Sequence, residues 1–217
     1  MTRVKICGLT TASDLEAAVE AGADAVGVIV DVPVDTHREV DPETAAALLD
    51  EVPPFVSSVL VTMADDPGTA IDLVERVDPD VLQLHGCLPP GDLAYVAASI
   101  DARFVLAIDA TEPDDLDLAR EVTDVVDAVL VDSLDDGAGG TGETHDWVRT
   151  RDGIADLDVP VVLAGGLTPS NVGRAIATVD PFAVDVASGV EREDGHKDHD
   201  SLRAFVERAT RPQEAPA

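Results

Sequence analysis

Residues 161–189, VVLAGGLTPSNVGRAIATVDPFAVDVASG, contain two short apolar runs separated by a helical segment. The runs VVLA (161–164) and AVDV (183–186) are rich in β-branched residues and have the length of buried strands, and a helix is predicted to begin at Pro169. Two strands joined by a helix in this way favour a right-handed βαβ unit, whose strands are parallel.

The same alternation of short apolar runs and amphipathic helical runs extends over the whole chain of 217 residues. The other predicted strands are 4–7, 25–30, 55–61, 81–84, 104–108 and 128–131. Eight such units fit a compact (β/α)₈ TIM barrel of the α/β class better than an open doubly wound sheet. We expect a single domain over residues 1–209 and a disordered tail, rich in Pro and Ala, over residues 210–217.

Local signals predict where several of the helices begin. Ser13 and Asp41 are candidate N-caps for the first two helices, and a proline follows Asp41 in the first turn. A short helix is expected around Trp147, and the last helix is expected over residues 201–209.

The charge of the chain is strongly unbalanced. The sequence contains 44 Asp and Glu against 14 Lys and Arg, a formal charge of −30, and Lys5 and Lys197 are its two lysines. Such a surface repels polyphosphate and anionic lipid, which argues against nucleic acid and membranes as partners. Repulsion between like charges weakens the compact state in dilute buffer, so we infer a halophilic protein from a cytoplasm of high ionic strength.

Cysteine and histidine usage indicates a cytoplasmic protein without a metal centre. Cys7 and Cys87 are too few for a disulfide framework, and no histidine has the spacing of a metal ligand set. We find no leader-like segment and no apolar stretch of about 20 residues. We expect no cofactor, and the sequence leaves the oligomeric state open.

Glycine-containing loops follow the last three predicted strands. Active sites of TIM barrels lie at the carboxyl ends of the strands, and phosphate is often held by the loops after strands seven and eight. One such loop is a weak signal, because a tight turn also needs glycine, but three in succession predict a site for a phosphorylated small molecule. The residues concerned are Gly140, Gly142, Gly165, Gly166, Ser188 and Gly189.

A thiol and a carboxyl group lie at the ends of strands one and six. Cys7 and Asp132 are thereby placed across the barrel mouth, where they could act as general base and general acid on two atoms of one substrate. Each also has an ordinary interpretation, Cys7 as a small buried apolar residue and Asp132 as a cap. Lys5 points into the barrel beside Cys7, and we hypothesise that its charge lowers the Cys7 pKa below about 8.5.

Two further side chains at the mouth are candidates for substrate binding. Arg38, in the loop after the second strand, could bind a carboxylate through two hydrogen bonds, although a solvated surface arginine is equally consistent with the sequence. His85, at the end of the fourth strand, is a polar wall of the pocket or a proton donor.

The strings KICGLT, QLHG, VDAVLVDS with GGTGETHDW, LAGGLTPSNV and DVASGVE follow one another in order along the chain. In sequence and spacing they resemble the phosphoribosylanthranilate isomerase family of tryptophan biosynthesis, over essentially the whole chain. The resemblance implies a (β/α)₈ barrel that catalyses, without a cofactor, the Amadori rearrangement of N-(5-phosphoribosyl)anthranilate to 1-(2-carboxyphenylamino)-1-deoxyribulose 5-phosphate.

The resemblance also implies roles for individual residues. Cys7 matches the general base of the family and Asp132 its general acid, Arg38 matches the arginine that binds anthranilate, and His85 and Asp185 match pocket residues. The string around Arg38 differs from the family pattern, since residues 36–39 read THRE. A non-catalytic barrel that binds a phosphorylated metabolite, and another sugar-phosphate barrel enzyme of amino-acid biosynthesis, are the alternatives.

The charge imbalance generates a first prediction. The melting temperature should rise as KCl is increased, because the Debye length falls to about 3 Å at 1 M salt and repulsion between surface carboxylates is screened. A thermal melt across a KCl series measures this. A melting temperature that does not rise with salt would contradict the inference of a high-salt cytoplasm.

Overall fold

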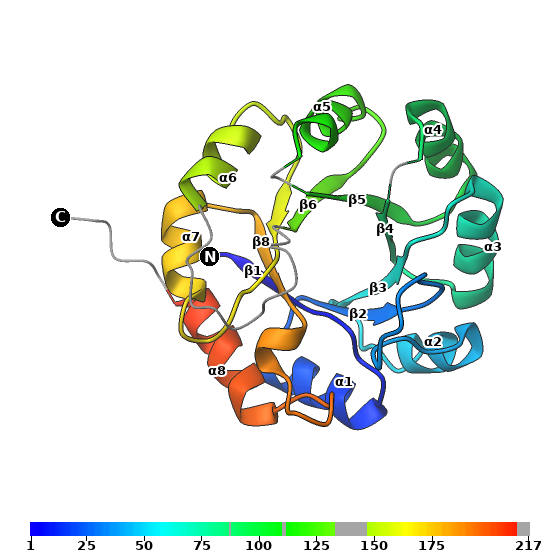
Figure 1. Ribbon diagram of the computed structural model, residues 1–217. Coiled ribbons are helices and arrows are strands. Elements are labelled where there is room, and N and C mark those ends of the chain that lie inside the picture. The colour runs from blue at the N-terminus through cyan, green and yellow to red at the C-terminus, as the bar shows by residue number, and fades with distance from the viewer. Residues whose placement is uncertain (87, 110–111, 133–146, 212–217) are drawn as a thin grey trace.

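A computed structural model describes residues 1–86, 88–109, 112–132 and 147–211. In this part of the chain, eight parallel strands form a closed barrel in the order β1 to β8, and β8 pairs with β1 to complete it. The helices surround the strands (Figure 1). The strands are β1 (Arg3–Ile6), β2 (Ala25–Ile29), β3 (Ser57–Thr62), β4 (Val81–His85), β5 (Arg103–Asp109), β6 (Ala128–Asp132), β7 (Val161–Leu163) and β8 (Ala183–Val186).

Helices follow the strands in regular alternation, which confirms the predicted TIM barrel. The helices are α1 (Ala12–Ala21), α2 (Pro42–Leu49), α3 (Pro67–Val77), α4 (Pro90–Ser99), α5 (Pro113–Glu121), α6 (Trp147–Ile154), α7 (Val172–Val179) and α8 (His199–Thr210), with a 3₁₀ helix, η1 (Ser188–Val190), after β8. The tail predicted over residues 210–217 begins too early, because Thr210 is the last residue of α8, and residues 212–217 lie outside the described residues. None of the described helices combines the length and apolar composition needed to cross a lipid bilayer.

Several predicted boundaries were wrong. Thr11 rather than Ser13 caps α1, because its side chain accepts a hydrogen bond from the Asp14 amide. Strand β3 begins at Ser57, and Phe55, predicted to lie within it, has a φ of 76° and is fully exposed.

The last two helices also begin elsewhere than predicted. Helix α7 begins at Val172 rather than Pro169, after a turn in which the Asn171 side chain accepts from the Thr168 amide. Helix α8 begins two residues before the predicted Ser201, because Asp198 is its N-cap.

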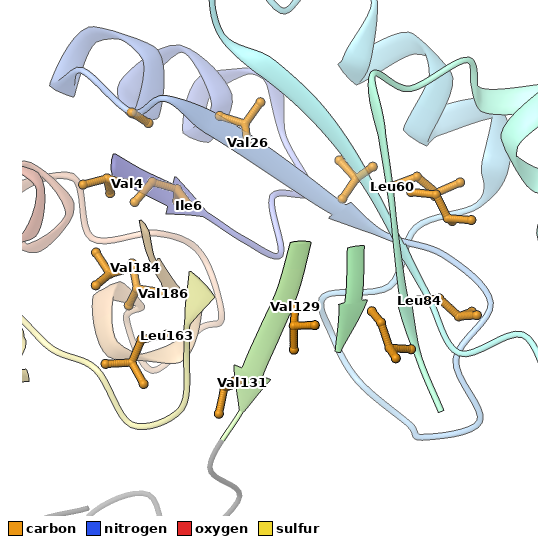
Figure 2. Packing of buried hydrophobic residues seen from close by; sticks show 14 of the residues in the cluster. Val4, Ile6, Val26, Leu60, Leu84, Val129, Val131, Leu163, Val184 and Val186 are labelled. Atoms are coloured by element: carbon orange, nitrogen blue, oxygen red, sulfur yellow. The ribbon is translucent and has the colours of Figure 1, made fainter. Parts of the chain in front are cut away.

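Because side chains alternate along each strand, the described core consists of one large cluster between the strands and the helices and two smaller clusters inside the barrel. Val4 and Ile6 of β1 point toward the helices, and Figure 2 shows them beside Val184 and Val186 of β8, their partners in the register. Cys7 belongs instead to a smaller apolar cluster inside the barrel. The alternation predicted for the first strand is therefore confirmed.

Aspartates that directly precede strands β2, β4 and β6 cap the beginnings of β1, β3 and β5. Asp24 accepts from the Val4 amide at 2.8 Å, Asp80 from the Ser58 amide at 2.8 Å, and Asp127 from the Phe104 amide at 2.9 Å. These carboxylates satisfy backbone donors at the amino-terminal end of the barrel, opposite the strand ends that carry the predicted site.

Removal of one of these caps should destabilise the barrel. Asp80→Ala removes the acceptor for both the amide and the hydroxyl of buried Ser58. We expect the free energy of unfolding to fall by about 1–3 kcal/mol, the typical cost of an unpaired buried donor. Urea denaturation at high KCl measures the loss. Asp72→Ala, which removes an exposed carboxylate from α3, is the matched control, and an equal loss in both variants would show that Asp80 acts through charge alone.

Candidate active site

The pairing of β1 with β8 brings three of the predicted residues together. In its register Lys5 lies opposite Asp185, and the Lys5 Nζ donates to Asp185 Oδ1 at 3.0 Å. Both side chains are buried, as is Cys7 directly after β1. Gly27 of β2 provides the space, because a Cβ atom there would lie 3.2 Å from Cys7 Sγ and 3.3 Å from Lys5 Nζ. Sequence reasoning did not single out Gly27.

The pKa of Cys7 corrects the hypothesis about Lys5. Burial raises the pKa of the Cys7 thiol above its ordinary value, and this effect outweighs the positive charge of Lys5, which acts in the opposite direction. The negative charge of Asp185 raises the Cys7 pKa further. Because burial raises a pKa whose ordinary value already lies above 7, Cys7 is a protonated thiol at neutral pH.

Asp132 ends β6 and lies opposite Asp109 of β5 in the strand register. Burial raises the pKa of Asp132 to about 6, and the charges of Asp185 and Asp109 contribute to the rise. Its Oδ1 atom is buried and has no hydrogen-bond partner among the described residues. Asp132 can therefore hold a proton closer to neutral pH than an ordinary carboxyl group does.

His85 ends β4 and contacts Gln83, whose side chain also points into the barrel. The Gln83 Nε2 lies 2.7 Å from His85 Nε2, and Gln83 itself is buried. Burial and, to a smaller extent, the nearby charge of Lys5 lower the pKa of His85 to about 4. The imidazole is thus neutral at pH 7 and can form hydrogen bonds without adding charge. The sequence analysis did not single out Gln83.

The loops after β7 and β8 contain the predicted phosphate-binding glycines. Gly165 and Gly166 have φ values of 82° and 58°, in the left-handed region that favours glycine. A Cβ atom on Gly189 would collide with the Leu167 carbonyl oxygen, so Gly189 allows the two loops to pack together. Ser188 is exposed at the start of η1. The predicted residues Gly140 and Gly142 lie outside the described residues.

Arg38 lies over the turn that follows β1. A Cβ atom on Gly8 would be 2.8 Å from Arg38 Cδ, so the glycine lets the arginine side chain cross close to Cys7. The guanidinium forms two hydrogen bonds with Glu191, from Nε to Oε1 at 2.8 Å and from Nη2 to Oε2 at 2.7 Å. Arg38 is therefore not a freely solvated side chain.

Sequence reasoning missed Glu191 as a partner of Arg38, and it missed Lys197 as a partner of Glu191. The Lys197 Nζ donates to Glu191 Oε1 at 2.7 Å. The rarity of lysine is the signal that could have pointed to Lys197. The chain has two lysines and a formal charge of −30, so each lysine is a candidate for a specific role in binding or structure.

Comparison with known proteins identifies the family. A model of the N-(5'-phosphoribosyl)anthranilate (PRA) isomerase family matches residues 4–208. This chain belongs to the PRA isomerase family. The N-(5'-phosphoribosyl)anthranilate isomerase of Halobacterium salinarum is 60% identical, over 97% of this chain and 96% of that protein. The isomerase of Halorubrum lacusprofundi is 55% identical over 99% of both chains.

Solved PRA isomerases have the same fold. The crystal structure of the enzyme from Thermotoga maritima has a TM-score of 0.85 and 37% identity, covering 96% of this chain and 98% of that one. A structure of PRA isomerase in complex with reduced 1-(o-carboxyphenylamino)-1-deoxyribulose 5-phosphate has a TM-score of 0.79 and 36% identity, with the same coverage. The PRA isomerases of Halobacterium salinarum and Halorubrum lacusprofundi come from halophilic archaea, which agrees with the high-salt character inferred from the charge.

The raised pKa of Asp132 has a consequence for the stability of this PRA isomerase. A carboxyl group whose pKa is higher in the folded state than in the unfolded state binds more protons when folded, so its ionisation destabilises the fold as pH rises from about 4 through about 6. Asp132→Asn should therefore raise the free energy of unfolding at pH 7.5 by about 3 kcal/mol, since the pKa rises by about two units from its ordinary value and one unit corresponds to about 1.4 kcal/mol.

The gain should shrink as the pH is lowered toward 4.5, where Asp132 is protonated in the folded state. Urea denaturation of wild type and Asp132→Asn at both pH values measures the difference. Asp72→Asn, at an exposed position, should show no such pH dependence. A gain of equal size at both pH values would contradict the assignment of the burial effect to Asp132.

Proposed function

We propose that this chain isomerises N-(5'-phosphoribosyl)anthranilate to 1-(2-carboxyphenylamino)-1-deoxyribulose 5-phosphate, the Amadori rearrangement of tryptophan biosynthesis. The observation that carries the proposal is the match to the PRA isomerase family over residues 4–208, which includes β2 to β8, all of β1 except its first residue, and most of α8. The related structure that holds a reduced form of the product supports the same reaction. A cytoplasmic location and the absence of nucleic-acid partners remain expectations from the sequence.

In the proposed reaction, Asp132 is the general acid. It donates its proton to the ring oxygen of the ribose, the bond between this oxygen and C1' breaks, and the lone pair of the anthranilate nitrogen forms the C1'=N bond of a Schiff base. A pKa of about 6 suits this role, because a useful fraction of the carboxyl is protonated near neutral pH and proton donation is still favourable.

Cys7 is the proposed general base. The thiol first loses its proton to solvent, and the resulting thiolate removes the proton from C2'. The electrons of the C–H bond form the C1'=C2' bond of an enolamine while those of the C=N bond return to the nitrogen. The enolamine then gains a proton at C1' as its 2'-hydroxyl loses one to become the ketone. Burial raises the pKa of Cys7, so the thiolate is a strong base once formed. The reaction is an isomerisation in which protons move between atoms, so the proposal requires no redox group.

The remaining predicted residues have proposed binding roles. Backbone amides of the loops that contain Gly165, Gly166 and Gly189, with Ser188, would bind the phosphate, and Gly140 and Gly142 would contribute from the loop after β6. Backbone amides suit this role in an acidic chain, since their N–H groups can bind the phosphate without a cationic side chain. Neutral His85 and the paired Asp185 would line the sugar pocket, and Arg38 would bind the anthranilate carboxylate.

Two substitutions test the proposed acid and base. Loss of phosphoribosylanthranilate fluorescence at molar KCl should report turnover by the wild type. Cys7→Ser and Asp132→Asn should each reduce kcat by about 10²- to 10⁴-fold, the usual contribution of a general acid or base. Cys87→Ser is the matched cysteine control and should retain wild-type turnover.

The alternatives have different outcomes in the same assay. Unchanged turnover in Cys7→Ser or Asp132→Asn would refute the role given to that residue. A wild type that binds the reduced product analogue but shows no turnover would favour a non-catalytic barrel. A wild type that neither binds the analogue nor reacts would favour another sugar-phosphate enzyme.

A further inference from the structure

Three charged side chains from distant segments form a cluster at the barrel mouth. Arg38 comes from the loop between β2 and α2, and Glu191 and Lys197 come from the segment between η1 and α8. Glu191 accepts two hydrogen bonds from Arg38 and one from the Lys197 Nζ, at 2.7–2.8 Å. The Glu191 side chain is 6% exposed, and the half-exposed His37 ring lies 3.5 Å from its Oε2.

Lys197 is the most deeply buried member of this charge cluster. It is 1% exposed, and its Nζ also donates to the Ala187 carbonyl oxygen at 3.1 Å, immediately after β8. Burial of an ammonium group costs free energy unless a nearby negative charge and hydrogen bonds offset it. Glu191 supplies the charge. Burial alone would raise the Glu191 pKa, but the hydrogen bonds from Arg38 and Lys197 hold it at about 2.

The balance of charge in the cluster depends on Lys197. Arg38 and Glu191 alone would form a neutral pair, and a neutral pair attracts a further carboxylate only weakly. With Lys197 the three groups carry two positive charges and one negative charge, a net charge of +1. The cluster thus has a net positive charge in a chain whose formal charge is −30.

The hydrogen bonds of Arg38 also leave one part of its guanidinium available. The Nε and Nη2 atoms bind Glu191, whereas Nη1 makes no hydrogen bond to the described residues. The close passage over Gly8 fixes where the side chain crosses the turn beside Cys7. Because one side of the planar guanidinium is bound to Glu191, a ligand can form hydrogen bonds only with the side that carries Nη1. Glu191 thus sets the direction from which a ligand approaches Arg38.

We propose that Glu191 and Lys197 are positioning residues for recognition of the substrate carboxylate. Glu191 holds the plane of the Arg38 guanidinium, and Lys197 offsets the charge of Glu191 so that Arg38 remains attractive to an anion. The inference rests on the proposed function, since it takes the anthranilate carboxylate as the ligand of Arg38. A role for Lys197 solely as a tie between Ala187 and Glu191 would instead affect every ligand of the mouth.

Two probes separate these roles. One is reduced 1-(o-carboxyphenylamino)-1-deoxyribulose 5-phosphate, and the other is the same compound with a phenyl group in place of the carboxyphenyl group. Lys197→Met should weaken binding of the carboxylate probe about tenfold, because the net charge beside Arg38 falls to zero, and leave the phenyl probe within about twofold of wild type. In turnover assays, KM should rise about tenfold while kcat changes less than about threefold.

Matched variants control for folding and for overall charge. Lys197→Gln keeps a hydrogen-bond donor and removes only the charge, so it should reproduce the selective loss even if Lys197→Met does not fold. Lys197→Arg keeps the charge and should bind the carboxylate probe within about threefold of wild type. Arg76→Met removes an exposed cation whose partner is Glu43, and it should affect neither probe. Titration calorimetry at molar KCl measures binding, and thermal melting confirms the folded state.

Equal weakening of both probes in Lys197→Gln would overturn the inference in favour of the structural tie. Unchanged binding of the carboxylate probe by Lys197→Gln would overturn the inference entirely. Failure of the proposed function has a separate signature, because a wild type without turnover of phosphoribosylanthranilate disproves that function whatever Lys197→Gln does to the two probes.

Discussion

The pairing of β1 with β8 is the constraint on which the rest of the barrel mouth depends. It closes the sheet, and its register sets Lys5 against Asp185 and places the Cys7 amide 2.9 Å from the Val186 carbonyl oxygen. The candidate base, the buried ion pair and the segment that contains Ser188 thereby come to one side of the mouth. A shift of one residue in this register would turn Lys5 and Cys7 toward the helices and bring Val4 and Ile6 inside.

A few of the many acidic residues have a direct role in the fold. Asp24, Asp80 and Asp127 accept backbone hydrogen bonds at the amino-terminal end of the barrel, away from the candidate site. The two lysines lie inside the protein, each bonded to an acidic partner near β1 or β8. Surface lysine, a strongly hydrated ammonium on a long apolar stem, is thus absent. The two ammonium groups act in low-dielectric surroundings, where a single charge has the largest effect.

Much of the fold could be predicted because each unit of the barrel carries its own local signals. Short β-branched runs located the strands, and the period-two pattern of the first strand showed that Lys5 and Cys7 point inward while Val4 points outward. Cap choice was less predictable. Thr11 and Ser13 both offer a hydroxyl, and Asp198 and Asp200 both offer a carboxylate, so the backbone conformation decides between them. Phe55 was assigned to a strand from its residue type, although its position is a fully exposed turn.

The candidate site was predictable where chemistry resides in one residue at a strand end, as for Cys7, His85 and Asp132. It was not predictable where the effect is a balance between groups far apart in the sequence. The Cys7 pKa depends on burial and on Asp185 as well as on Lys5, so its direction could not be inferred from the neighbouring lysine. Glu191 meets Arg38 across 153 residues, a contact that no local pattern encodes.

The burial of both lysines has a consequence for how the molecule responds to its surroundings. Reagents that acylate primary amines reach a lysine in the folded protein only when the mouth of the barrel opens, since Lys5 and Lys197 are 7% and 1% exposed. Lys5 lies within the barrel interior and Lys197 lies in the segment between η1 and α8, so the rates of labelling at the two positions report separately on local openings of these regions. Labelling of Lys5 and Lys197 therefore reports local opening of the barrel mouth.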